Sequence, residues 1–178
     1  MTAGPTGGVV LVGPRGAGKS TLAPALATEL GWSTADTDDL IALQTGRPVA
    51  EFLLEAGEAE FRKVEEGVVL AALASNERRV LALGGGAVLA AKTRARLARP
   101  GHFVVFLAAP IEVLVERANI GPARPPLTDL PAAEEVAWLL ERRRPHYLAV
   151  ADLEVDTFCS NVTACVRSIM ANMGHSGG

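Results

Sequence analysis

Short apolar runs alternate with longer segments of helical periodicity along the 178-residue chain. The apolar runs have the length of buried strands. The pattern predicts strands at Val9 to Val12, Ser33 to Asp36, Arg79 to Leu83, His102 to Leu107 and Leu153 to Asp156.

The segments between these runs have the period of helices. Between Phe61 and Ala74, apolar residues recur at threes and fours, which predicts a stripe facing a sheet; its members are Phe61, Val64, Val68, Ala71 and Ala72. A last helix is predicted at Thr163 to Met173. Strands separated by helices imply right-handed crossovers and a parallel sheet covered on both faces. We therefore predict an α/β fold, a three-layer α/β/α sandwich around a five-stranded parallel sheet, with ligands at the carboxyl ends of its strands.

Composition and charge narrow the functional classes. With 49% hydrophobic residues, the chain is long enough for one well-buried core and too short for two full domains. The formal net charge is −3 and no long basic run occurs, so no groove for nucleic acid is expected. No apolar stretch reaches the roughly 18 residues of a membrane span, and the N-terminus does not have the order of a signal peptide. We expect a cytoplasmic monomer that binds neither nucleic acid nor membranes.

The cysteines and histidines give no sign of a metal centre or a disulfide framework. Cys159 and Cys165 are six residues apart, which fits neither a CxxC pair nor a secreted disulfide scaffold, and we expect both to be packing residues. The three histidines are scattered. The only metal predicted is therefore one bound together with a nucleotide.

The strongest chemical signal is the stretch GPRGAGKS, which follows the first predicted strand and fits the pattern GxxxxGK[ST]. In such a phosphate loop, or P-loop, backbone amides face the phosphates and the following helix directs its positive end at them. Lys19 is expected to reach the β- and γ-phosphates and Ser20 to bind Mg²⁺. The predicted nucleotide-binding residues are Gly13, Pro14, Arg15, Gly16, Ala17, Gly18, Lys19, Ser20 and Thr21.

A second ligand for Mg²⁺ is expected from an acid at the end of a strand. Only the second predicted strand ends in an acidic cluster, ADTDD. Asp36 and Asp38 are two apart, so in an extended backbone both could face the phosphate loop. We predict that Asp36 binds Mg²⁺ with Ser20. The alternative, that the acids merely cap a helix beginning at Leu40, is credible for Asp39, less so for Asp38 and least for Asp36.

Six motifs in consistent order together resemble shikimate kinase. They are GPRGAGKST, DTDD, EFRKVEE from Glu60, LGGGAV from Leu83, ARPPL from Ala123 and RRPHY from Arg143. The resemblance spans Val9 to about Val166. It implies a P-loop fold with a mobile lid that transfers the γ-phosphate of ATP, with Mg²⁺, to the 3-hydroxyl of shikimate.

The resemblance implies an acceptor site of arginines and glycines. Shikimate carries a carboxylate, and Arg62 and Arg143 are implied as its clamp. Gly84, Gly85 and Gly86 are implied to contact the substrate, and Asp38 to orient the acceptor hydroxyl and accept its proton late. Taken alone, Arg62 beside glutamates is more typical of a solvated salt bridge, and only the ordered set of motifs favours the clamp. Likewise, Arg142 and Arg144 adjoin Arg143, which only the family spacing selects.

The same resemblance divides the chain into regions. It implies one domain, 1–178, with a substrate-binding region at about 37–76 and a lid at about 119–131. The lid contains Arg124, which resembles an arginine that meets the transferring phosphate, and Arg117 resembles a second nucleotide-contacting arginine. Ser160 stands where the family often has an arginine, which leaves the base contacts open.

Two other functions are compatible with the phosphate loop. Another small-molecule kinase, for gluconate or a nucleoside monophosphate, would keep the loop and the lid arginine. It would not explain EFR, GGG and RRPHY together. A nucleotide-binding module without transfer activity is disfavoured because Lys19, Ser20, Asp36, Asp38 and Arg124 are all present.

Overall fold

Five parallel strands form one sheet in the order β2-β3-β1-β4-β5. The computed structural model describes residues 6–75, 77–120 and 125–173. The strands are β1 (Gly8–Val12), β2 (Ser33–Asp36), β3 (Arg79–Ala82), β4 (Phe103–Ala108) and β5 (Leu153–Asp156). All five predicted strands are confirmed, β2 and β5 with the predicted ends.

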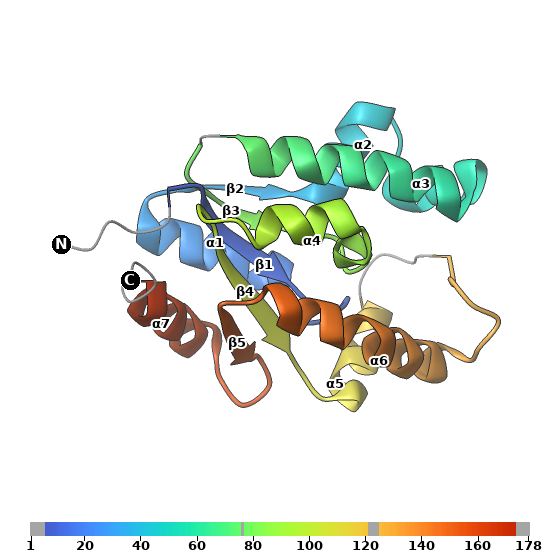
Figure 1. Ribbon diagram of the computed structural model, residues 1–178. Coiled ribbons are helices and arrows are strands. Elements are labelled where there is room, and N and C mark those ends of the chain that lie inside the picture. Colours follow the sequence, from blue (N-terminus) through green and yellow to red (C-terminus); the bar gives the residue numbers. More distant parts are fainter. Residues whose placement is uncertain (1–5, 76, 121–124, 174–178) are drawn as a thin grey trace.

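Helices cover both faces of this sheet, so the predicted three-layer α/β/α sandwich is confirmed (Figure 1). They are α1 (Lys19–Leu30), α2 (Thr37–Thr45), α3 (Val49–Ala74), the 3₁₀ turn η1 (Ala87–Leu89), α4 (Ala91–Leu97), α5 (Ile111–Ile120), α6 (Ala132–Val150) and α7 (Val162–Met173).

Alternate residues of β1 enter two separate hydrophobic cores. Val9 and Leu11 pack with α1, α5 and α7, whereas Val10 and Val12 pack with α3, α4 and α6. Successive side chains of a strand point to opposite faces, so a strand covered on both sides is apolar throughout. All five residues of β1 are buried. The central strand therefore holds the phosphate loop at its carboxyl end on a rigid base.

The helix α3 differs from its predicted form in two ways. It begins at Val49 and is interrupted at Gly57, whose φ of 79° and ψ of 164° are not helical. Ala71, predicted to face the sheet, is exposed, and Val69 and Leu73 are buried in its place. The apolar stripe is displaced because the helix also packs against α2 and α4, and not only against the sheet.

The cysteines are only partly as predicted. Cys165 is buried and belongs to the core around α7, but Cys159 is exposed, so the packing role is wrong for Cys159. Within the described ranges, no helix is both long and apolar enough to cross a membrane. The same residues contain no group of three or more His, Cys, Asp or Glu side chains that could hold a metal ion.

Candidate active site

The phosphate loop connects β1 to α1 and has the backbone of a tight glycine-rich turn. Positive φ angles occur at Gly13 (148°), Gly16 (81°) and Gly18 (91°). Residues with side chains rarely adopt such angles. The Lys19 ammonium donates hydrogen bonds to the carbonyl oxygens of Gly13 (2.7 Å) and Pro14 (2.8 Å). These bonds fold the lysine back over the loop.

The first turn of α1 leaves its positive end open to an anion. The helix begins at Lys19 directly after Gly18, and no acidic residue occurs in its first turn. Nothing on the helix therefore neutralises the partial positive charge of its first amides. Ser20 and Thr21 are exposed, whereas Ala17 is buried and donates from its amide to the carbonyl of Pro14.

The acidic cluster lies at the end of β2, but its geometry corrects the prediction. The side chain of Asp36 accepts a hydrogen bond from the amide of Asp38 (2.8 Å) and caps α2, which begins at Thr37 and not at Leu40. Asp38 is therefore in the first turn of a helix, and the argument from an extended backbone is wrong. Of the three acids, Asp36 was considered the least suited to a capping role, yet Asp36 is the residue that caps α2. Burial raises the pKa of Asp36 above its ordinary value. The hydrogen bond from the Asp38 amide and the charge of Lys19 lower this pKa, whereas the charges of Asp38 and Asp39 raise it further.

The glycine loop, Gly84 to Gly86, follows β3 between the phosphate loop and the acidic cluster, because β3 separates β1 from β2. None of its three glycines is among those with positive φ, so their backbone conformation does not require glycine. Glycine is required instead because neighbouring groups approach the loop closely. A β-carbon at Gly84 would lie 2.8 Å from Glu65 Oε1 and 3.2 Å from Asp38 Oδ1. The space that side chains would fill is taken by neighbouring charged groups.

The other two glycines bring the arginines and the phosphate loop to the same place. A β-carbon at Gly86 would lie 2.2 Å from Arg62 Nη1. One at Gly85 would lie 3.4 Å from the carbonyl oxygen of Gly13 and 3.6 Å from Arg143 Nη1. The glycine loop is thus the common neighbour of every acceptor-side residue predicted from the sequence.

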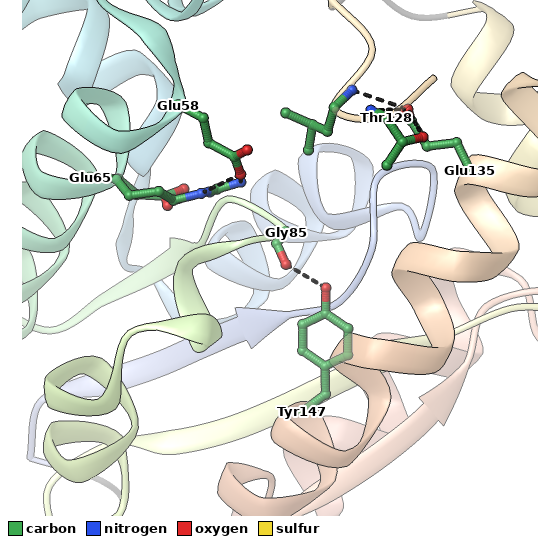
Figure 2. A network of polar contacts seen from close by, with 8 residues as sticks. Glu58, Glu65, Gly85, Thr128, Glu135 and Tyr147 are labelled. Carbon is green, nitrogen blue, oxygen red and sulfur yellow. Dashed lines mark hydrogen bonds and ion pairs between the residues drawn. The ribbon is translucent and has the colours of Figure 1, made fainter. Parts of the chain in front are cut away.

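Arg62 is both a salt-bridge partner and a neighbour of the glycine loop. Its guanidinium pairs with Glu65 (2.6 Å) and, more loosely, with Glu58 (3.4 Å). The pair with Glu65 is not a solvated surface bridge, because the Glu65 side chain is only 4% exposed. Burial raises the pKa of Glu65, and the charge of Arg62 opposes that shift. The side chains of Glu58 and Glu65 approach the site from α3, as Figure 2 shows.

Of the three consecutive arginines on α6, only Arg143 is buried. Arg142 lies over the ring of Trp138, 4.6 Å from its centroid, and Arg144 pairs with Glu154 near the surface. Arg143 Nε is buried and has no hydrogen-bond partner within the described part of the chain. Burial lowers the pKa of Arg143, while the hydroxyl of Tyr147 opposes the change. A buried guanidinium with an unused donor is suited to a carboxylate.

Three further residues of this site were not predicted from the sequence: Thr37, Glu65 and Tyr147. The amide of Gly84 donates to Thr37 Oγ1 (2.9 Å), and the hydroxyl of Tyr147 donates to the carbonyl oxygen of Gly85 (2.5 Å; Figure 2). Glu65 could have been found, since it lies three residues from Arg62 and a charged residue interrupts the apolar stripe there. Thr37 and Tyr147 lie inside the DTDD and RRPHY motifs, but no local signal assigns either of them a role.

Arg117 lies beside the phosphate loop and is fixed by hydrogen bonds to Gly16 and Thr157. It donates to the carbonyl of Gly16 (3.4 Å) and to the hydroxyl and carbonyl oxygens of Thr157 (both 3.2 Å). A pocket of about 230 Å³ opens beside it; its lining includes Gly18, Thr21, Leu22, Ser160 and Val162. This pocket continues the phosphate loop toward the loop after β5. A larger pocket of about 460 Å³, around 97–103 and 149–152, contains none of the predicted site residues.

The predicted lid is only partly described. Asn119 and Ile120, its first two residues, belong to α5, and Arg124 lies outside the described residues. Residues 125–131 are irregular, and Thr128 within this segment is bound to Glu135 of α6 (Figure 2). There, the Glu135 carboxylate accepts hydrogen bonds from the amides of Leu127 (3.0 Å) and Thr128 (2.9 Å) and from the Thr128 hydroxyl (2.8 Å).

Comparisons with known proteins agree with this geometry. The family model described as shikimate kinase matches residues 15–174. Shikimate kinases of Mycobacterium leprae and Salinispora tropica are 46% and 47% identical to the chain; the matches cover 92% and 83% of the chain and 81% and 86% of the relatives.

Solved structures give the same result. The shikimate kinase of Acinetobacter baumannii in complex with shikimate superimposes with a TM-score of 0.86 at 32% identity, over 95% of this chain and 92% of that one. A gluconokinase of Sinorhizobium meliloti, 18% identical with a TM-score of 0.57, covers 97% of this chain and 95% of its own and shares the fold alone.

Proposed function

The chain belongs to the shikimate kinase family, and from that premise we propose how its own residues transfer the γ-phosphate of ATP to the 3-hydroxyl of shikimate. One observation carries the proposal. A β-carbon at Gly85 would lie 3.4 Å from the carbonyl oxygen of Gly13 in the phosphate loop and 3.6 Å from Arg143 Nη1, so the two are close to the same point. If Arg143 holds the carboxylate of shikimate, the ring hydroxyls of the same molecule would therefore lie beside the phosphate donor.

Arg143 and Arg62 bind the carboxylate of shikimate. Arg143 offers a buried, unused Nε donor, and Arg62 is held by Glu65 next to Gly86. A guanidinium can form two parallel hydrogen bonds to a carboxylate, which fixes the orientation of the ring as well as its position. The glycine loop forms the floor on which the ring lies, since it presents backbone without side chains.

The phosphate loop and Arg117 hold ATP. The triphosphate lies along the phosphate loop, with Lys19 moving from the Gly13 and Pro14 carbonyls to the β- and γ-phosphates. The nucleoside end occupies the pocket lined by Thr21, Arg117 and Ser160. The hydroxyl of Ser160 makes a smaller and uncharged contact there than an arginine would.

Mg²⁺ suits the two oxygen donors that the chain offers. Ser20 provides an exposed hydroxyl in the first turn of α1, and Asp36 provides a carboxylate within electrostatic reach of Lys19. Hard oxygen ligands are those that Mg²⁺ prefers, and it usually keeps several waters. When bound, the ion neutralises charge on the phosphates.

Asp38 orients the acceptor. Its carboxylate lies beside Gly84, on the glycine loop that carries the substrate. Phosphoryl transfer passes through a loose transition state in most accounts, so alignment and charge neutralisation matter more than early deprotonation. Asp38 therefore holds the 3-hydroxyl in line with the phosphate and accepts its proton late. Lys19 and, from the lid, Arg124 offset the charge of the transferring group.

We also propose that the chain is one domain with a substrate-binding region at about 37–76 and a lid at about 119–131, and that it acts as a monomer in the cytoplasm. The attachment of Leu127 and Thr128 to Glu135 supports a lid whose C-terminal end is anchored to α6.

A coupled ADP-release assay tests the function. Purified protein with Mg²⁺ and ATP is offered shikimate, quinate, gluconate and nucleoside monophosphates. We expect strong stimulation by shikimate, and a product that carries phosphate on the 3-oxygen by ³¹P and ¹H NMR. Strong stimulation by a monophosphate or by gluconate, and none by shikimate, would overturn the assignment.

A further inference from the structure

The glycine loop is held from two sides by buried hydroxyl groups. On one side the amide of Gly84 donates to Thr37 Oγ1 at 2.9 Å, and on the other Tyr147 Oη donates to the carbonyl oxygen of Gly85 at 2.5 Å. Both side chains belong to residues that are 0% exposed. They come from positions 47 residues before and 62 residues after the glycines that they bind. The loop is thus fixed by residues remote in sequence.

Each hydroxyl belongs to a residue adjoining one functional group of the acceptor site. Thr37 directly precedes Asp38 and is the first residue of α2. Tyr147 follows Arg143 by four residues on α6, which places the two side chains on the same face of the helix. The Tyr147 ring is itself fixed, stacked on Phe106 with 5.0 Å between centroids. The Thr37 contact therefore connects the loop to Asp38, and the Tyr147 contact connects it to Arg143.

We propose that Thr37 and Tyr147 are positioning residues: Thr37 keeps the glycine loop in register with Asp38, and Tyr147 keeps it in register with Arg143. The inference rests on the proposed shikimate site and goes beyond it. Neither residue touches the substrate, because both are fully buried and their hydroxyls are occupied by the loop backbone. They act through Asp38 and Arg143.

The two residues should have different kinetic signatures. Asp38 acts on the reacting hydroxyl, so a shift of the loop relative to Asp38 harms alignment that matters in the transition state and lowers kcat. Arg143 binds the carboxylate, remote from the reaction, so a shift relative to Arg143 weakens binding in ground and transition state alike and raises KM. A shift of the glycine loop can thus change kcat and KM separately.

Thr37→Val and Tyr147→Phe test the proposal, since each removes a hydroxyl and keeps the shape of the side chain. We expect Thr37→Val to lower kcat about tenfold or more with little change in the KM for shikimate, as misplacement near the chemistry can cost about 100-fold. We expect Tyr147→Phe to raise the KM for shikimate about tenfold with a smaller change in kcat. Thr37→Ser, which keeps the hydroxyl, should restore most of the kcat.

Thr93→Val is the matched control. Thr93 is also 0% exposed, but its hydroxyl has no hydrogen-bond partner among the residues that the structure describes. Its replacement should leave both kinetic constants at the wild-type value. Thermal unfolding of every variant separates loss of folded protein from loss of function.

The outcomes distinguish failure of the inference from failure of the proposed function. If wild-type protein does not phosphorylate shikimate in the same assay, the function is wrong. If wild type is active and the folded variants keep both constants, Thr37 and Tyr147 are structural residues only and the inference is wrong. A uniform loss in both variants, with no split between kcat and KM, would also overturn it.

Discussion

The donor side and the acceptor side of the site are built in different ways. The phosphate loop is one continuous segment whose main groups are backbone atoms, and even Lys19 rests on the carbonyls of Gly13 and Pro14. The acceptor side is assembled from β2–α2, α3, the glycine loop and α6, through side chains that meet around three glycines. A continuous loop tolerates substitution elsewhere, whereas an assembled site depends on many remote contacts.

This difference predicts that variants on the acceptor side change shikimate kinetics and leave ATP binding nearly intact. The largest effect is expected for Asp38→Asn, which should lower kcat by about 10²–10⁴-fold because the amide cannot accept the proton. The KM for ATP should change by less than about threefold. Steady-state kinetics with each substrate varied in turn measure both. Unchanged turnover would remove Asp38 from the mechanism.

Arg143→Lys should have the next largest effect. Lysine keeps the charge but loses the planar fork, so the KM for shikimate should rise about 10–100-fold. Arg144→Lys is the matched control, because Arg144 is near the surface and pairs with Glu154; exposed pairs contribute about 0–1 kcal/mol at most. Equal effects of the two variants would assign the clamp to the wrong arginine. Isothermal titration with shikimate provides an independent measure.

Gly86→Ala should have a smaller effect on the same side. A β-carbon at Gly86 would lie 2.2 Å from Arg62 Nη1, so the guanidinium must move. The φ of −95° allows alanine, so the fold should survive. We expect the KM for shikimate to rise about tenfold, a loss of about 1.4 kcal/mol in binding. Gly67→Ala, in α3 with open space around it, should leave the kinetics unchanged and favour the helix by up to about 1 kcal/mol.

The ionisation of Tyr147 is expected to have the smallest effect, because it changes the free energy of unfolding only at alkaline pH. Burial, its largest cause, raises the pKa of this hydroxyl from 10.0 to about 12. The folded protein therefore keeps the proton longer than the unfolded chain. The resulting stability is fully present below pH 10 and is lost as the pH rises to 12, roughly 3 kcal/mol in total.

Because Tyr147 is the only tyrosine in the chain, tyrosinate absorbance reads its titration directly. Denaturant unfolding at pH 9 and 11 measures the loss of stability. A native tyrosine that ionises near pH 10 would show that its hydroxyl is not held as described.

Strands β1, β3 and β4 were predictable because apolar runs reveal buried strands directly, whereas the residues of β2 are exposed or half-buried. The β2 strand was predicted to its ends, but the start of α2 was not, since it depends on one hydrogen bond from the Asp38 amide to Asp36. Ala71 was misassigned because periodicity does not tell which neighbour a helix packs against.

The site was also only partly predictable: its contiguous segment was predicted better than its dispersed residues. The phosphate loop is contiguous and was read from residues alone. Arg62 and Arg143 needed the family resemblance, because Arg62 beside glutamates is more typical of a salt bridge and Arg143 has an arginine on either side. Thr37 and Tyr147 lie inside two of the motifs but were assigned no role, since their partners Gly84 and Gly85 lie 47 and 62 residues away and no spacing rule relates them.

The strand order has a consequence for how the molecule forms. β3 lies between β1 and β2, although it follows both in the chain. The phosphate loop and the acidic cluster are therefore synthesised first, but they acquire their mutual arrangement only when β3 inserts between their strands and brings the glycine loop with it. Parallel strands cannot pair through short turns, so this insertion requires contacts between distant segments. A folding chain would therefore bring its phosphate loop and its acidic cluster together only in the step that adds β3 to the sheet.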